Sequence, residues 1–319
     1  MTQYPLPVAL ILALAVTAGA AIGSQKQPGK SKIPDKATID FGTDRPFGNV
    51  RVPYHLVNGT PAIAVTWNGH KTDCFLDTGT TRLTTFSPMG LGGDDWGDGG
   101  NYTWAGGRSY KCRIVSTDIR IGSIRIKDFP QYLVGDKKLT AAQMPSALPI
   151  IGSDLMSYLV VSFDPVKKEV AFRTPTYQPD VKGAHVLPVH WDGYDQPYVD
   201  ATINGKRVKM TVDTGWNGSY VVNVKAAKRL FPRVKVGKAT TKAGIAAGAW
   251  AQVKSVLKLG PETDVTHSVN VCDMMTLTDG SVGWPFLTLY DITLDFPRHR
   301  LILRNLSPAD VKRLANESQ

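Results

Sequence analysis

The sequence predicts an all-β chain with few short helices, and two features of its composition carry this expectation. The 319 residues include 30 glycines and 21 prolines, which favours many short strands joined by turns over long helices. Nearly all acidic residues are aspartate, because the only glutamates are Glu169, Glu262 and Glu317. Aspartate favours turns and helix caps whereas glutamate favours helix interiors, so this bias also indicates a β-rich protein.

One segment of the chain occurs twice. Residues 61–86 read PAIAVTWNGHKTDCFLDTGTTRLTTF, and residues 197–222 read PYVDATINGKRVKMTVDTGWNGSYVV. Each copy has an Asn-Gly pair, at 68–69 and 204–205, between runs in which apolar residues alternate with polar ones. This pattern is typical of two antiparallel strands joined by a tight turn.

Both copies end their second predicted strand on Asp-Thr-Gly, at 77–79 and at 213–215. Further along, Ile150-Ile151-Gly152 has a counterpart in Val282-Gly283. Landmarks that recur in the same order indicate a duplicated unit. The chain is therefore interpreted as two related β-rich lobes, at 49–175 and 187–305, joined by a linker.

The two ends of the chain are expected to lie outside these lobes. Residues 5–23 are apolar and end in small residues, which is typical of a signal peptide within 1–23 or, alternatively, of an uncleaved membrane anchor. Residues 24–48 are interpreted as a linker or a short prosegment, and 306–319 as a tail helix. The folded part is thus expected to be exported: secreted, periplasmic or in the cell envelope.

The doubled pattern resembles the pepsin-like and retropepsin-like aspartic proteases. The resemblance covers most of residues 49–305 and rests on the two Asp-Thr-Gly motifs and the two later glycine segments. It implies the acid protease fold, in which two β-barrel-like lobes are related by a pseudo-twofold axis with a central cleft between them. Because this chain supplies both halves, we expect a monomer.

Asp77 and Asp213 are the predicted catalytic pair. Two carboxyls brought together by symmetric loops cannot both be ionised, so they share one proton. The ionised group can take a proton from a water molecule while the protonated group donates to a substrate carbonyl. The sequence therefore predicts an aspartic endopeptidase for peptide or protein substrates that needs no cofactor and no metal.

The resemblance also assigns supporting roles. Thr78 and Thr214 are expected to brace the two loops across the lobe boundary, and the other loop residues expected to support the site are Gly79, Thr80 and Gly215. The family usually has Ser, Thr or Ala after Asp-Thr-Gly, whereas the second copy here has Trp216. Its indole could reshape the site or swing outward into a substrate pocket. The alternative function is therefore a catalytically inactive relative that binds peptides in the cell envelope.

A hairpin over the cleft, the flap, is the other site feature that the resemblance implies. The candidate hairpin is 101–110, where either Tyr102 or Trp104 could cover the substrate. The preceding acidic and glycine-rich stretch, 91–101, is expected to be a flexible loop next to it.

Two remaining features have competing interpretations. In an exported protein Cys74 and Cys112 could form a disulfide and leave Cys272 free, although three buried thiols are equally compatible with the sequence. The basic residues between 225 and 238 are interpreted as a solvated face. No nucleic-acid-binding motif accompanies them, so no nucleic-acid partner is predicted.

Overall fold

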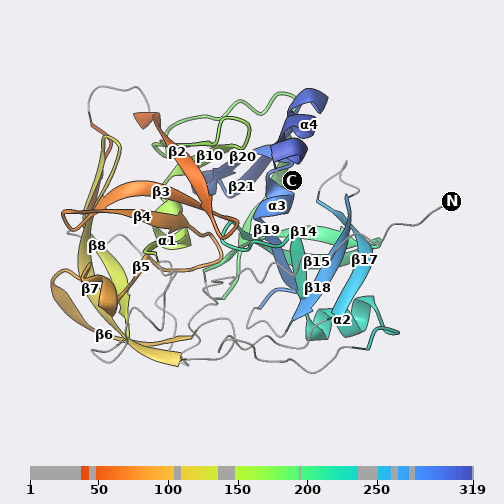
Figure 1. Ribbon diagram of the computed structural model, residues 1–319, viewed down its shortest axis with the longest axis horizontal. Helices are drawn as coiled ribbons and strands as arrows, with labels where there is room; N and C mark the ends of the chain where they lie inside the picture. The colour runs from red at the N-terminus through yellow and green to blue at the C-terminus, as the bar shows by residue number, and fades with distance from the viewer. Residues whose placement is uncertain are drawn as a thin grey trace.

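A computed structural model describes residues 37–42, 48–103, 109–135, 148–193, 195–235, 251–259, 265–272 and 277–317. These residues form two β-sheets with a few short helices, so the predicted fold class is confirmed (Figure 1). The expected signal peptide or anchor at 1–23 lies outside the described residues. Among the residues that are described, no helix is both long and apolar enough to cross a membrane.

The larger sheet has 14 strands, in the order β12-β21-β20-β10-β11-β2-β3-β4-β9-β5-β8-β7-β6, with β1 paired to β8. Its strands are β1 (Thr38–Asp40), β2 (Val50–Val57), β3 (Thr60–Trp67), β4 (His70–Leu76), β5 (Thr84–Phe86), β6 (Asp95–Thr103), β7 (Ser109–Ile121), β8 (Ile124–Val134), β9 (Ile150–Ile151), β10 (Val160–Asp164), β11 (Glu169–Arg173), β12 (His185–Pro188), β20 (Tyr290–Asp295) and β21 (Arg300–Asn305).

The smaller sheet has seven strands, in the order β13-β14-β15-β19-β16-β18-β17. They are β13 (His190–Trp191), β14 (Pro197–Ile203), β15 (Lys206–Asp213), β16 (Tyr220–Asn223), β17 (Ala251–Lys258), β18 (Val265–Cys272) and β19 (Gly280–Gly283). The helices are α1 (Ser153–Met156), α2 (Val224–Leu230), α3 (Trp284–Leu287) and α4 (Pro308–Glu317), with the 3-10 turns η2 (Ser87–Met89) and η4 (Phe296–Arg298).

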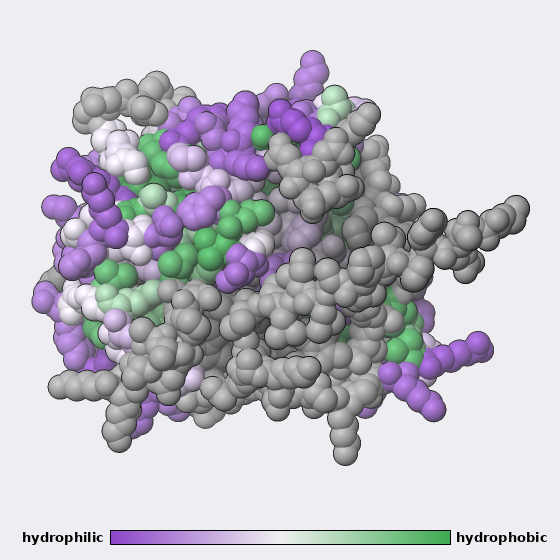
Figure 2. Space-filling view, viewed as in Figure 1, coloured by the Kyte–Doolittle hydropathy of each residue, from purple (hydrophilic) through white to green (hydrophobic). Residues whose placement is uncertain are grey.

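The larger sheet runs through both halves of the chain. Strand β20, from the second half, pairs antiparallel with β10, from the first. Figure 1 shows β10, β20 and β21 between the strands β3–β8 on one side and β14–β18 on the other. Figure 2 shows hydrophilic residues along the upper edge of this face, where Figure 1 labels β10, β20 and α4. The two lobes are therefore joined by continuous backbone pairing, and their exact bounds stay a prediction.

The two Asn-Gly turns have the same backbone conformation. Asn68 and Gly69 have φ values of 46° and 82°, and Asn204 and Gly205 have 48° and 75°. Positive φ at both central residues defines the type I′ turn that matches the twist of a two-residue hairpin. Each asparagine side chain also accepts a backbone N–H from a strand alongside, from Asp118 at 2.7 Å in the first copy. The hairpins predicted from the repeat are thus present in both halves.

The later glycine segments lie beside the strands that carry the Asp-Thr-Gly motifs. Strand β9 pairs in parallel with the end of β4, placing Ile151 opposite Leu76. Strand β19 pairs in parallel with the end of β15, placing Gly283 opposite Asp213. A short helix follows each segment, α1 in the first half and α3 in the second. The same strand-loop-helix arrangement therefore supports each loop.

Side chains from both halves pack into one main hydrophobic core. On one face of β10, Phe163 packs edge-on against Trp284 of α3, with ring centroids 5.1 Å apart. Tyr54 of β2 packs edge-on against the same indole at 5.5 Å. Edge-to-face packing of large rings adds stability beyond the area they bury. This cluster fixes α3, and with it the Asp-Thr-Gly loop of the second half, against the larger sheet. Because both halves of the chain contribute strands to it, we call it the shared sheet.

The cysteine alternatives are resolved for two of the three residues. Cys74 and Cys112 are both buried free thiols, so the alternative of a disulfide between them is wrong. Cys74 lies in the main core, whereas Cys112 belongs to a second, smaller hydrophobic cluster and donates its S–H to Gly99 O at 3.1 Å. The two thiols therefore belong to different packing units. The side chain of Cys272 lies outside the described part.

The expectation of a loop at 91–101 is wrong for most of that stretch, because β6 begins at Asp95. Two irregularities in the pairing with β7 follow Asp95 and Asp98, where Gly97 and Gly100 have φ values of 130° and 76°. Each aspartate side chain accepts the N–H of the glycine two residues on, at 2.9 Å. Glycine and aspartate here build β-bulges, which the composition alone cannot distinguish from a loop.

The type I′ turns provide a test of the repeat. Nothing lies within 4 Å of a Cβ built at Gly205, so alanine there introduces backbone strain without a steric clash. We expect Gly205→Ala to lower the free energy of unfolding by about 1 kcal/mol, because its left-handed conformation disfavours a Cβ. Gly205→Asn should cost less, since asparagine tolerates this conformation. Urea unfolding measures both, and equal losses for the two variants would contradict the assignment.

Candidate active site

The two Asp-Thr-Gly loops begin where β4 and β15 end, and each folds around its own carboxylate. In both loops one carboxylate oxygen accepts the backbone N–H groups of the residues two and three positions on. Gly79 and Thr80 donate to Asp77 Oδ1 at 2.9 and 3.2 Å, and Gly215 and Trp216 donate to Asp213 Oδ1 at 3.1 and 2.9 Å. The loop backbone thus fixes the orientation of both side chains.

Thr78 and Thr214 lock the two loops to each other. The Thr78 N–H donates to Thr214 Oγ1 and the Thr214 N–H donates to Thr78 Oγ1, each at 3.0 Å. The hydroxyls donate onward to the opposite half, from Thr78 to Val212 O at 2.5 Å and from Thr214 to Leu76 O at 2.7 Å. Both threonines are fully buried. The structure therefore places these residues in the bracing positions that the resemblance implies.

The two glycines let the carboxyls come together. A Cβ built at Gly79 would overlap the carboxyl of Asp213, and one built at Gly215 would overlap the carboxyl of Asp77. Each carboxyl therefore packs directly on the glycine of the opposite loop, and a hydrogen bond joins the two carboxyls. Asp77 is 3% exposed and Asp213 is 7% exposed, so the pair is buried.

Two further hydrogen bonds, which we call the outer ties, connect each Asp-Thr-Gly loop to the other half of the chain. The sequence did not predict them. Thr60 Oγ1 donates to Gly215 O at 3.0 Å, and Gln196 Nε2 donates to Gly79 O. Positions 60 and 196 are separated by the same interval as the two catalytic candidates, and each stands directly before the proline that opens its copy of the repeat. Thr60 and Gln196 are therefore equivalent positions one residue before each copy of the repeat. Because threonine and glutamine differ chemically, the sequence gives no sign of this equivalence.

The residue after each Asp-Thr-Gly motif gives the two carboxyls different hydrogen-bond partners. The Thr80 hydroxyl donates to Asp77 Oδ2 at 2.7 Å. At the equivalent position, the indole of Trp216 packs against Gly218 and Gly283 and is 6% exposed. Its N–H has no hydrogen-bond partner among the described residues. Trp216 therefore does not swing outward, and Asp213 receives no hydroxyl hydrogen bond at this position.

The pKa values of the two carboxyls follow from these surroundings. Burial raises the pKa of Asp77, while the Thr80 hydroxyl, which favours the ionised form, opposes that rise. Burial raises the pKa of Asp213 well above its usual range, and the charge of Asp77 raises it further. The Thr80 hydroxyl thus favours the ionised form of Asp77, whereas burial and the charge of Asp77 both favour the protonated form of Asp213.

Tyr102 is the flap candidate that the structure brings to the pair. It lies on β6 opposite Tyr110 of β7 and is 2% exposed. Burial raises the pKa of Tyr102 well above its usual range, the charge of Asp77 raises it further, and a hydrogen bond with Thr80 lowers it. The phenol thus lies close to the first loop, whereas Trp104 falls outside the described residues.

Asp154 accepts hydrogen bonds next to the first loop, and the sequence did not predict this role. Its carboxylate accepts the N–H groups of Leu83 and Leu155, both at 2.8 Å, while the neighbouring Ser153 N–H donates to Thr80 O at 2.8 Å. Burial raises the pKa of Asp154 to about 6, and the charge of Arg82 opposes the rise. No cluster of His, Cys, Asp or Glu suited to a metal ion occurs in the described part of the chain.

Known proteins similar to this chain were found both among protein families and among solved structures. Residues 199–286 match the family described as "Aspartyl protease", which confirms the predicted resemblance to that family and includes the second Asp-Thr-Gly loop. Among solved structures, the crystal structure of aspartic proteinase from Irpex lacteus is similar over 81% of this chain and 98% of that chain, with 15% identity and a TM-score of 0.49. No match to a curated protein was found.

The threonine lock predicts a large effect from a near-isosteric change. Thr78→Val removes the hydroxyl that donates to Val212 O and accepts the Thr214 N–H, so we expect a loss of about 2 kcal/mol or more in the free energy of unfolding. Thr78→Ser keeps the hydroxyl and should lose much less. Thr72→Val, on the partly exposed side of β4, is the matched control and should change stability by less than about 0.5 kcal/mol. Similar losses at Thr72 and Thr78 in chemical unfolding would contradict the lock.

The raised pKa of Asp213 predicts a pH-dependent stability. The folded chain holds this proton more tightly than the unfolded chain, so stability from this group is present at low pH and is lost as pH rises above about 4. Asn does not titrate, so Asp213→Asn should become more stable than the wild type toward pH 7, by about 1 kcal/mol or more. Thermal unfolding from pH 4 to 7 measures this difference.

Asp95→Asn is the control for this pH series. A hydrogen bond from Arg113 lowers the pKa of the Asp95 carboxyl, which is the opposite direction to the shift at Asp213. The Asp95 variant should therefore show no gain toward neutral pH. A pH-independent difference between wild type and Asp213→Asn would show that Asp213 is not the protonated member of the pair.

Proposed function

We propose that this chain is an aspartic endopeptidase that hydrolyses peptide bonds with a water molecule activated by Asp77 and Asp213. The observation that carries the proposal is the placement of the two buried carboxyls, each packed on the glycine of the opposite loop and joined by a hydrogen bond. The match of residues 199–286 to the aspartyl protease family supports it. The proposed substrates are peptides or proteins.

The unequal surroundings of the two carboxyls support a proposed division of roles. Asp77, stabilised as a carboxylate by Thr80, takes a proton from the water that attacks the peptide carbonyl. Asp213 carries the shared proton and donates it to the carbonyl oxygen as the tetrahedral intermediate forms. When the intermediate collapses, the proton held by Asp77 passes to the leaving amine, and a hydroxyl of the intermediate returns its proton to Asp213 as the carbonyl forms again. The enzyme forms no covalent bond to the substrate in this scheme.

The proposed enzyme is complete in one chain. Both carboxyls, both bracing threonines and both outer ties belong to the same molecule, so a monomer contains every group that the scheme uses. Tyr102, close to Thr80, is proposed to cover a bound peptide from the side of β6 and β7. Export remains part of the proposal and is supported by the apolar run at 5–23, which also leaves a membrane tether open.

A second candidate function is peptide binding without hydrolysis. It is favoured by Trp216, whose side chain packs against Gly283 and leaves Asp213 with backbone donors only. The two functions use the same site and differ only in whether the bound peptide is hydrolysed.

The pair is tested by isosteric substitution. Asp77→Asn and Asp213→Asn should each lose nearly all peptide hydrolysis, because one carboxylate cannot both activate water and protonate the carbonyl. The double variant should be scarcely less active than either single variant, since groups that act as a unit are not additive. Cleavage of a fluorogenic peptide library measures all three variants.

Asp200→Asn, an exposed residue of β14, is the control and should cleave like the wild type. Melting temperatures show that each variant is folded. If folded Asp213→Asn kept wild-type turnover, the two-carboxyl scheme would be wrong. If the wild type bound peptides from the library without cleaving any of them, the binding function would replace the enzyme.

A further inference from the structure

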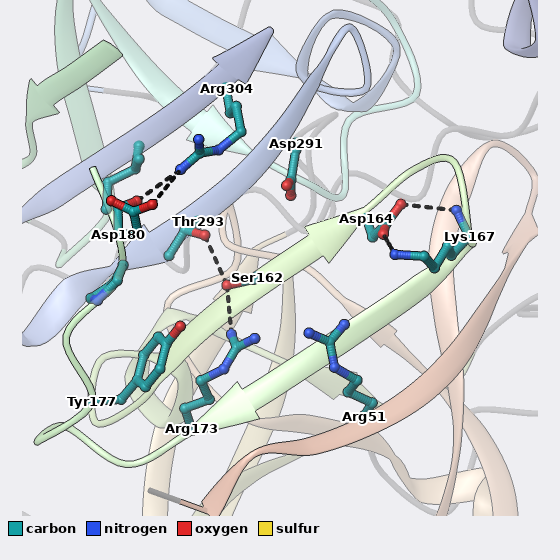
Figure 3. A pocket seen from close by; sticks show the side chains of 12 residues that line it. Arg51, Ser162, Asp164, Lys167, Arg173, Tyr177, Asp180, Asp291, Thr293 and Arg304 are labelled. Atoms are coloured by element: carbon teal, nitrogen blue, oxygen red, sulfur yellow. Dashed lines mark hydrogen bonds and ion pairs between the residues drawn. The ribbon is translucent and has the colours of Figure 1, made fainter. Parts of the chain in front are cut away.

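A polar pocket lies on the shared sheet, away from the Asp-Thr-Gly loops. It has a volume of about 230 Å³, and its floor is one face of β21, β20, β10, β11 and β2 (Figure 3). None of the residues that line it belongs to either catalytic loop. The opposite face of β10 is apolar and packs through Val161 and Phe163 into the main core. The pocket therefore occupies the solvent side of the sheet that joins the two halves.

The register of the strands explains why this face is hollow. Ser162 of β10 lies opposite Thr293 of β20 and opposite Ala171 of β11, and Ala171 in turn lies opposite Arg51 of β2. Three consecutive positions across the sheet thus carry small side chains. Longer charged side chains from adjacent positions surround this row, as Figure 3 shows.

Most charges around the pocket have a partner of opposite sign. These pairs are Lys167 with Asp164 at 2.8 Å, Arg51 with Glu169 at 3.6 Å and Arg304 with Asp180 at 3.9 Å. Two charged side chains, Arg173 and Asp291, form no ion pair with any described residue. One is a cation and the other is an anion, and both line the same pocket.

Arg173 is held rigidly although it lacks a carboxylate. Its side chain is buried, with the residue 6% exposed; Nη1 donates to Ser162 Oγ at 2.8 Å, and the guanidinium stacks over the Tyr177 ring at 4.5 Å. A guanidinium has five N–H donors, and Ser162 is the acceptor of one of them. Burying such a group without a counter-ion is costly, so the remaining donors provide a preformed oxyanion site. Arg51 points toward the same space from the neighbouring strand (Figure 3).

Asp291 lies on the other side of the small residues. Its carboxylate accepts no hydrogen bond from a described residue and is only partly exposed. Burial raises the pKa of Asp291, and the nearby charge of Asp164 raises it further, while the charges of Arg304, Lys167 and Arg173 oppose this rise. Because the Asp291 carboxylate lines the pocket and has neither an ion pair nor a hydrogen bond among the described residues, this end of the pocket offers an acceptor for an ammonium group.

We propose that this pocket binds a small zwitterion of the amino-acid type, with its carboxylate on Arg173 and Arg51 and its ammonium on Asp291. The two unpaired charges of opposite sign favour a ligand with both groups over a simple anion or a simple cation. A volume of about 230 Å³ is small for a binding pocket, which limits the ligand to about the size of a free amino acid.

A ligand series tests the charge pattern with the full chain. Unbranched ω-amino acids with one to five methylene groups are compared with carboxylic acids and amines of the same length, by calorimetry and thermal shift. One chain length should bind best, and it should bind at least about tenfold more tightly than its matched acid or amine, because it alone satisfies both charges. If no amino acid binds, or if the matched acid binds equally well, the proposal is overturned.

Variants assign the two ends of the ligand. Asp291→Asn should abolish the advantage of the amino acid over the matched acid while the acid still binds, and Arg173→Gln should weaken both by about tenfold or more. Arg120→Gln, an exposed arginine of β7, is the matched control and should bind like the wild type. If Arg173→Gln fails to fold, the binding series with Asp291→Asn tests the proposal alone. If Asp291→Asn still prefers the amino acid over the matched acid, the proposal is overturned.

Discussion

The reciprocal hydrogen bonds between Thr78 and Thr214 are the constraint on which the rest of this site depends. Two carboxyls do not come together spontaneously in a protein interior, since burial and mutual repulsion both oppose it. Here each loop is fixed by the backbone and hydroxyl of the other, at 2.5 to 3.0 Å, through residues separated by more than a hundred positions. Thr60 and Gln196 add an outer pair of ties to the same loops. The lock therefore offsets the cost of crowding the carboxyls and determines their relative position.

The sequence predicted the features that repeat and missed those that depend on one half meeting the other. The Asn-Gly hairpins, the loops and the glycine segments all follow from local patterns that occur twice. The pairing of β10 with β20 does not, because a strand that is buried on one face gives no sign of which distant strand will lie beside it. Gln196 was missed for a related reason, since its role is shared with Thr60 through position and not through chemistry. In β6, bulges formed by Gly97 and Gly100 gave a strand the composition of a loop.

The shared sheet has different tasks on its two faces. Its apolar face carries Phe163 and Tyr54, which pack against Trp284 at the start of α3 and so support the loop that holds Trp216 and Asp213. Its polar face carries ion pairs at its edges, and Arg173 and Asp291 line it without an ion pair to any described residue. Alternation of side chains along each strand keeps these two environments separate although the same backbone forms both. Polar substitutions on the pocket face can therefore change ligand preference without altering the packing beneath the loops.

Fusion of the two halves in one chain is what allows the carboxyl pair to be unequal. In a symmetric homodimer the residue after Asp-Thr-Gly is necessarily the same in both loops, so neither carboxyl could differ from the other before a ligand binds. Here Thr80 gives its hydroxyl to Asp77, whereas Trp216 turns its indole toward Gly283 and gives Asp213 only a backbone N–H. The backbone of the two loops stays nearly equivalent, as their matching hydrogen bonds show. The Thr80 hydroxyl therefore favours the ionised form of Asp77 alone, on a framework that the reciprocal threonine hydrogen bonds keep symmetric.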